Sequence, residues 1–130
     1  MGIVNTNTVE TFGFYNDPIV IRKYIAGLQG GVVLDVEDFT EEYIKAGHII
    51  IYDKSLAVYK PLGVENGNYV SLPSNCNYEG VVVASKSVTE PFVGVMYSGE
   101  VNDVASPFPI TEELKTALKT AIPTLVFKHD

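Results

Sequence analysis

The sequence predicts a mainly β domain with a single α-helix near the C-terminus. Short segments rich in Val, Ile, Tyr and Phe recur along the chain between Gly, Pro, Asn and Asp residues, a pattern typical of strands and turns. Only residues 110–123 show the apolar spacing of an amphipathic helix. A chain of 130 residues, 46% of them hydrophobic, is long enough for one domain with its own core. No apolar run approaches the ~20 residues that span a membrane.

Residues 1–16 are expected to form an extended N-terminal arm that precedes a single β-rich domain at residues 17–130. The arm mixes Thr, Asn and Gly with a late aromatic group, Phe12, Phe14 and Tyr15. These rings have apolar area to bury, so they either cover the core of their own domain or dock on a partner chain. The arm lacks the basic start and apolar stretch of a secretory signal, and synthesis in the cytoplasm is therefore expected.

The first strand of the domain is expected to begin near Pro18. Asp17 followed by Pro18 also resembles a helix start, but the next three residues are β-branched and favour a strand. The glycines at positions 27, 30 and 31 predict a connection, and residues 32–36 predict a second strand. The sequence GLQGG lacks the glycine spacing of the known phosphate-binding loops, so no nucleotide site is predicted.

The middle of the chain contains one clear hairpin signal. Residues 39–47 are expected to form a short helical turn, and residues 48–62 predict two strands joined around Asp53. Residues 63–80 are dominated by Gly, Asn, Ser and Pro and are expected to form turns, most strongly at the Asn-Gly pair at positions 66 and 67.

Residues 81–101 predict two further strands. Gly94 and Gly99 interrupt the second of them, and each is expected to mark a bulge, a bend or a close approach of two backbones. After this segment, prolines break the chain into short pieces.

The helix predicted at residues 110–123 has well-defined ends. Thr111 is a good N-cap, two glutamates occupy the first turn, and Pro123 ends the helix. Its apolar face is formed by Leu114, Ala117, Leu118 and Ala121. Residues 124–127 then predict a last short strand.

The charge of the chain argues against nucleic acid as a partner. Sixteen acidic residues and nine basic residues give a formal net charge of −7, and the isoelectric point is near 4.7. This sign repels phosphate backbones, and no stripe of Lys and Arg overrides it locally.

The sequence contains no signature of catalysis, and neither a metal nor a cofactor is expected. Only two histidines are present; His48 begins a predicted strand and is expected to be structural, because no second His or Cys lies at ligand spacing. Cys76 has no partner cysteine and is expected to be an incidental thiol. The carboxylates at positions 37, 38, 41 and 42 offer oxygen ligands for Ca²⁺, but such clusters are usually a solvated face. We therefore expect a protein that is not an enzyme.

Several of these segments, in this order, resemble small head-decoration proteins of tailed bacteriophages. The resemblance is carried by YIKAGHIII, by GVMYSGEVN, by the proline-bounded helix ITEELKTALK and by the final TLVF, and it covers residues 17–130. The stretch from Asp17 to Ile51 is also similar to head-fibre proteins and other capsid-decorating proteins of phages and prophages.

This resemblance implies a compact β-tulip-like barrel or sandwich with one helix. It also implies a homotrimer that sits on the outer surface of the virion and stabilises the mature lattice by binding major capsid subunits. In relatives an N-terminal arm orders on the capsid, and by this analogy the capsid-contacting residues here are Ile3, Val4, Phe12, Phe14 and Tyr15.

Other functions stay open at this point. The base of a phage head fibre would share the trimer and bind a separate fibre protein. A small carbohydrate-binding β-domain would instead use surface tyrosines, of which the chain has eight in all, although strand tyrosines are more often half-buried packing residues.

Overall fold

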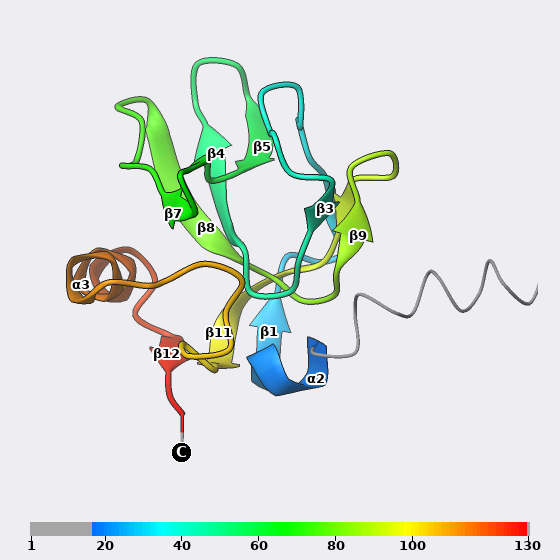
Figure 1. Cartoon of the computed structure of the whole chain (residues 1–130). Helices are drawn as coiled ribbons and strands as arrows, with labels where there is room; N and C mark the ends of the chain where they lie inside the picture. The colour runs from blue at the N-terminus through cyan, green and yellow to red at the C-terminus, as the bar shows by residue number, and fades with distance from the viewer. Residues whose placement is uncertain (1–16, 130) are drawn as a thin grey trace, which may run out of the picture.

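The computed structural model describes residues 17–129, and its central feature is a six-stranded sheet. Along the sheet the strand order is β1 (Ile21–Gly27), β11 (Val95–Val101), β8 (Cys76–Val82), β4 (Ile49–Asp53) and β5 (Val58–Pro61), all antiparallel. The short β12 (Leu125–Phe127) adds in parallel to the second half of β11. The described chain is therefore mainly β, as predicted (Figure 1).

Three two-stranded ribbons surround this sheet. They pair β2 (Val32–Val33) with β10 (Phe92–Val93), β3 (Tyr43–Ile44) with β9 (Lys86–Ser87), and β6 (Val64–Glu65) with β7 (Asn68–Tyr69). None of the sheets formed by residues 17–129 closes into a barrel. Within residues 17–129 the helices are a single turn, α2 (Asp17–Val20), and the longer α3 (Glu112–Ala121), and neither has the length or hydropathy of a membrane span.

The sheet is buried on both faces, which explains the isoleucine run in β4. Ile49 and Ile51 face a core shared with Leu118 of α3, whereas Ile50 faces a second core built with residues of β2, β3 and β10. The three isoleucines are at most 1% exposed, and burying each contributes roughly 2 kcal/mol. In Figure 1 α3 lies on one side of the sheet and the β3–β9 ribbon lies on the other.

The predicted hairpin and the predicted helix are confirmed. β4 and β5 pair across residues 48–62, and the carboxylate of Asp53 closes their turn by accepting bonds from the backbone of Ser55 and Leu56. The hydroxyl of Thr111 caps α3 by accepting a bond from the N–H of Leu114, and the helix ends before Pro123. The turn at Asn66 and Gly67 is also confirmed, because both have positive φ between β6 and β7.

Three local predictions are wrong. Asp17–Val20 form a helical turn, so the first strand begins only at Ile21; the Asp-Pro start outweighs the β-branched residues over one turn. No helical turn forms at residues 39–47; instead β3 pairs with β9 because this pairing buries Ile44 completely. Residues 63–80 are also less turn-rich than expected, since they include β6, β7 and the first half of β8.

Candidate interaction surface

The capsid-contacting residues implied by the sequence resemblance cannot be placed by the structure. Ile3, Val4, Phe12, Phe14 and Tyr15 lie outside the described residues. The domain itself offers two features to a partner: the edge formed by β1, and a groove beside α3.

The first feature is the outer edge of β1. Within residues 17–129, β11 is the only strand that pairs with β1, so the opposite edge presents backbone N–H and C=O groups. Four consecutive residues of this strand are exposed, from Arg22 to Ile25. Among them Tyr24 and Ile25 are 55% and 59% exposed, which is unusual for two adjacent apolar side chains on one strand. The edge therefore combines unpaired backbone with apolar area.

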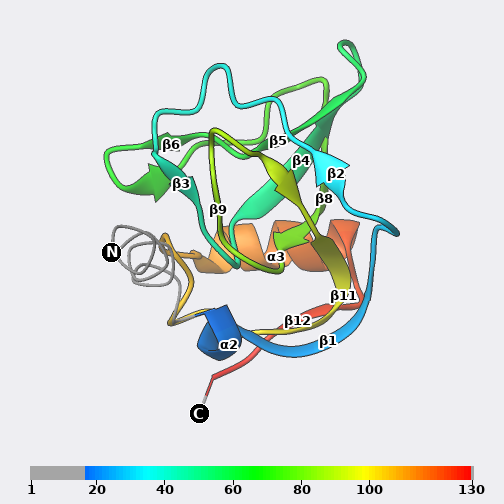
Figure 2. The ribbon, with the colours of Figure 1, turned by 90° about the vertical axis from the view of Figure 1, so that its right-hand side faces the viewer.

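A second exposed apolar pair lies on the two-stranded ribbon formed by β2 and β10. Val33 of β2 and Phe92 of β10 are directly opposite each other, and both are more than half exposed. Figure 2 shows β1 and the segment that leads into β2 along the same side of the molecule. We use the name β1 edge surface for strand β1 together with the exposed side chains of Tyr24, Ile25, Val33 and Phe92.

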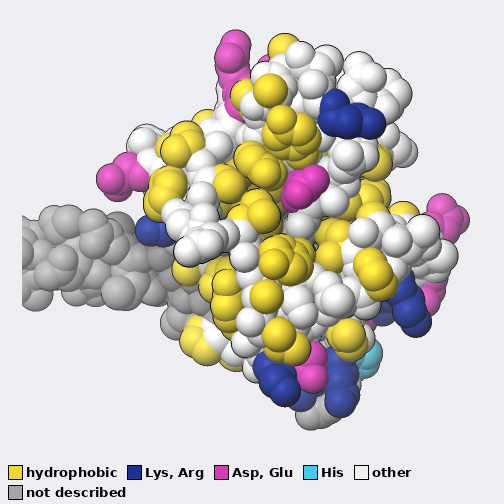
Figure 3. Space-filling model, turned by 180° about the vertical axis from the view of Figure 1, so that it is seen from behind, with side chains coloured by type: hydrophobic (Ala, Val, Ile, Leu, Met, Phe, Trp, Pro, Cys, Tyr) yellow, Lys and Arg dark blue, Asp and Glu magenta, His cyan; other side chains and the backbone are white. Residues whose placement is uncertain are grey.

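The β1 edge surface also differs in charge from the rest of the molecule. The chain has a net charge of −7, but Arg22, its single arginine, and Lys23 are adjacent and exposed on β1. In Figure 3 hydrophobic side chains are numerous on the face of the molecule that is turned to the viewer, with acidic ones spaced among them. A basic edge of this kind is complementary to an acidic partner surface.

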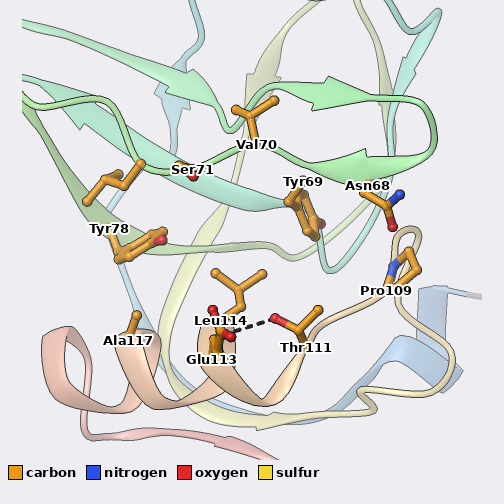
Figure 4. A pocket seen from close by; sticks show the side chains of 11 residues that line it. Asn68, Tyr69, Val70, Ser71, Tyr78, Pro109, Thr111, Glu113, Leu114 and Ala117 are labelled. Atoms are coloured by element: carbon orange, nitrogen blue, oxygen red, sulfur yellow. Dashed lines mark hydrogen bonds between the residues drawn. The ribbon is translucent and has the colours of Figure 1, made fainter.

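The second feature, which we call the α3 groove, consists of two neighbouring hollows. The first, of about 320 Å³, lies between α3 and the chain from β7 to β8 (Figure 4). The second, of about 720 Å³, lies between β8, β11 and the end of α3. Leu72 and Tyr78 line both hollows, so the two are neighbours. Glu113 is among the residues that line the first hollow and Glu79 among those of the second, and no Lys, Arg or His does so within the described residues.

His48 lies in the interior and packs against aromatic rings. It is 1% exposed, and the rings of Phe39, Tyr69 and Phe108 surround it with centroids 5.2 to 5.7 Å away. Its Nε2 donates to the carbonyl oxygen of Leu62 at 2.9 Å. Burial lowers its pKa to about 4, so the ring is neutral near pH 7. The geometry agrees with the structural role expected from the sequence.

Cys76 and the acidic side chains were the other candidates for a chemical role. Cys76 is 5% exposed, and burial raises the pKa of its thiol, which disfavours the nucleophilic thiolate. Among residues 17–129, no group of three or more His, Cys, Asp or Glu side chains could hold a metal ion.

Both surface features escaped prediction from the sequence. Nothing in the sequence marks the apolar residues of β1 as exposed, because periodicity does not show which strand ends a sheet. The α3 groove is formed largely by the segment 63–80, whose turn-like composition carries no periodic signal. Comparisons of the chain with models of protein families, with curated proteins and with solved structures found no match.

Proposed function

We propose that this chain is a capsid decoration protein of a tailed bacteriophage. It binds as a homotrimer to the outer surface of the head and stabilises the mature lattice by contacting major capsid subunits. The order of sequence segments over residues 17–130 supports this proposal, and so does the mainly β fold with one C-terminal helix. The β-tulip-like arrangement, the location on the virion and the absence of enzymatic activity are parts of the same proposal.

The observation that carries the proposal is the β1 edge surface. An open strand with two exposed apolar side chains can accept a strand of another chain through main-chain hydrogen bonds. In a ring of three copies each interface joins two different surfaces, so the basic β1 of one copy meets a surface of its neighbour that is not β1. Sixteen acidic residues against nine basic ones provide acidic side chains that can pair locally with the basic residues of β1.

A lattice of weak lateral contacts is stabilised by any protein that binds only its mature form. Three copies held together bind with avidity, so a weak contact by each is sufficient. This function requires an accessible strand edge and exposed apolar area, and both are present on β1.

Two measurements on the full chain test the proposal. Size-exclusion chromatography with light scattering is expected to give the mass of a trimer. Sedimentation with expanded heads assembled from the major capsid protein of the same virus is expected to show co-sedimentation. A monomer at tens of micromolar that stays in the supernatant would overturn the proposal.

A charge substitution on β1 tests whether this strand forms the trimer contact. Ile25→Glu is expected to weaken the trimer about tenfold or more, the loss typical of one central interface side chain. The matched control is Leu56→Glu, because Leu56 is equally exposed but lies in the turn between β4 and β5, at the opposite end of the sheet. Equal effects of the two variants would place the contact elsewhere.

A further inference from the structure

Strand β12 has an edge with no strand beside it among the described residues. Within residues 17–129 its one strand partner is β11, which it joins in parallel. In Figure 1 β12 lies on the far side of β11 from β1, close to α3. The edge of β12 that faces away from β11 is therefore open to an added strand.

The hydrogen bonds of β12 show which of its backbone groups are open. The carbonyl oxygen of Thr124 accepts a bond from β11, and the N–H of Lys128 donates a bond to β11. In a parallel pair alternate residues bond to the partner strand, so the backbones of Leu125 and Phe127 face the other way. The N–H of Leu125 donates to the carbonyl oxygen of Ile122 at the end of α3. The carbonyl oxygen of Leu125 and both backbone groups of Phe127 have no partner among the described residues.

A hollow of about 340 Å³ lies between this edge and α3. One wall is a stripe of helix residues spaced about one turn apart, and the other is Pro123 with all three residues of β12. Val126 is 47% exposed and adds apolar area beside the hollow. The helix residues that line the hollow differ from those that line the α3 groove; they are Glu112, Lys115, Thr116 and Lys119.

The cations beside the open edge favour an acidic partner. Lys115 is already paired, with Asp103 and with Glu112. Lys119 and Lys128 are exposed, and neither forms an ion pair with a described residue. Lys119 lies on the helix wall of the hollow, and Lys128 directly follows β12. In a chain with a net charge of −7, two unpaired cations next to an open strand edge are complementary to carboxylates of another molecule.

The open backbone groups distinguish an acidic peptide from other anions. A phosphate or a polyanion could contact the two lysines, but it carries no donor for the carbonyl oxygens of Leu125 and Phe127. An extended peptide supplies both N–H donors and carbonyl acceptors along one edge. Its carboxylate side chains can reach the lysines at the same time.

We propose that an extended acidic segment of a partner protein binds between β12 and α3 as an added strand, with its backbone bonded to Leu125 and Phe127 and its carboxylates near Lys119 and Lys128. The site is separate from the β1 edge surface, and the proposal holds whether or not the chain decorates a capsid.

The test is an NMR titration of the full chain with two acidic heptapeptides, in which Glu alternates with Val or with Leu and both ends are blocked. At least one is expected to bind and to shift the amide signals of residues 125–128 and of α3. Binding is also expected to slow hydrogen exchange at the N–H of Phe127, which is open in the structure described here.

Two matched peptides separate the contributions of charge and backbone. A peptide with Lys in place of each Glu is expected not to bind, because it is repelled by the two lysines. A peptide with methyl groups on its backbone nitrogens keeps the carboxylates but lacks the N–H donors, and it is also expected not to bind.

Variants of the chain then locate the peptide. Lys119→Glu is expected to weaken binding about fivefold, because it replaces an attraction by a repulsion. Lys86→Glu is the matched control: it makes the same change in net charge, but Lys86 is exposed on β9, on the other side of the sheet from α3. Its affinity is expected to stay within about twofold of the original. Thermal unfolding of each variant shows whether it is folded.

Three outcomes would overturn the proposal. If neither acidic peptide binds at millimolar concentration, the edge is not a site for acidic strands. If the methylated peptide binds as well as its parent, the contact is not an added strand. If the N–H of Phe127 is already protected in the free chain, the edge has another occupant: residues 1–16 if their deletion removes the protection, or a second copy if dilution removes it.

Discussion

Gly99 shows how a single residue sets the course of β11. Its φ is +150°, and it pairs with Tyr24 of β1 on one side and with Leu125 of β12 on the other. The register of β1 against β11 shifts on both sides of this pair, so a bulge lies here, as the sequence predicted. A β-carbon at Gly99 would collide with the backbone oxygen of Lys23 and would lie 2.7 Å from the sulfur of Met96.

Gly99→Ala is therefore expected to destabilise the domain by about 2–3 kcal/mol, because the variant must strain the backbone or displace β1. Gly94→Ala is the matched control in the same segment; a β-carbon there would meet only Val83, at an ordinary 3.7 Å, and a change within about 0.5 kcal/mol is expected. Urea unfolding at equilibrium measures both free energies. Equal losses would show that the close approach of the backbones at Gly99 does not matter.

His48 makes the stability of the domain dependent on pH. Its pKa is about 4 in the folded chain and 6.5 in the unfolded chain, so the unfolded state binds the proton more tightly. The contribution of His48 to the free energy of unfolding is therefore complete above pH 6.5 and is lost as the pH falls toward 4. The difference between these pKa values is equivalent to about 3 kcal/mol. The contribution of Asp53 to stability is lost at lower pH. Hydrogen bonds, of which the one from the Ser55 side chain is the strongest cause, lower the pKa of its carboxyl to about 2.

Unfolding free energies measured between pH 7 and pH 4 check this prediction. His48→Gln does not titrate, and its amide can still donate to the carbonyl of Leu62. The variant is expected to be less stable at pH 7, because it loses the ring contacts with Phe39, Tyr69 and Phe108, but to have a shallower dependence on pH in this window. An unchanged slope would mean that other groups are responsible for the acid sensitivity.

At the level of elements, the sequence predicted those parts of the fold that are determined by local chemistry. The hairpin at residues 48–62 and the helix after Thr111 both carry their own turn, cap and periodicity signals. The pairing of β3 with β9 depends on residues more than forty positions apart, and no local signal reports it. The one-turn helix α2 was missed because a single turn is too short for its periodicity to be recognised.

The same distinction explains the candidate sites. The exposure of Tyr24 and Ile25 depends on β1 being the end of the sheet, which is a property of the topology. The α3 groove joins residues of two distant segments, and only their packing brings Tyr78 close to the helix. Functional surfaces built from long-range packing are not visible in a single sequence.

Helix α3 provides the prediction at this scale. Thr111→Ala removes the hydroxyl oxygen that accepts a bond from the N–H of Leu114 and is expected to cost about 1 kcal/mol. Thr116→Ala is the control, because Thr116 is exposed within the helix and alanine has the higher helix propensity. Thermal unfolding should therefore show a lower midpoint for Thr111→Ala and no loss for Thr116→Ala. Equal losses in the two variants would show that the bond accepted by Thr111 at the start of the helix does not stabilise the domain.

At the level of the whole molecule, the sheet separates the two cores and leaves its β1 end available for contacts. Among the residues that the structure describes, those buried in the two cores all lie at or after Val20. The arm at residues 1–16 connects through α2 directly to β1. The arm and the β1 edge surface therefore adjoin in sequence, as expected if both contact neighbouring chains in one assembly.

Deletion of residues 1–16 is expected to separate folding from capsid binding. Because residues 17–129 pack into both cores that the structure describes, the midpoint of thermal unfolding and the trimer mass are expected to stay unchanged. Affinity for expanded heads is expected to fall by roughly a hundredfold, since three arms per trimer act together. Replacing Phe12, Phe14 and Tyr15 by Ala in the full-length chain should reproduce most of this loss if the rings provide the contact. Sedimentation of each variant with heads measures the affinity. A deletion variant that forms trimers and binds heads as well as the full chain would exclude a role for the arm. The β1 edge surface would then be left as the contact.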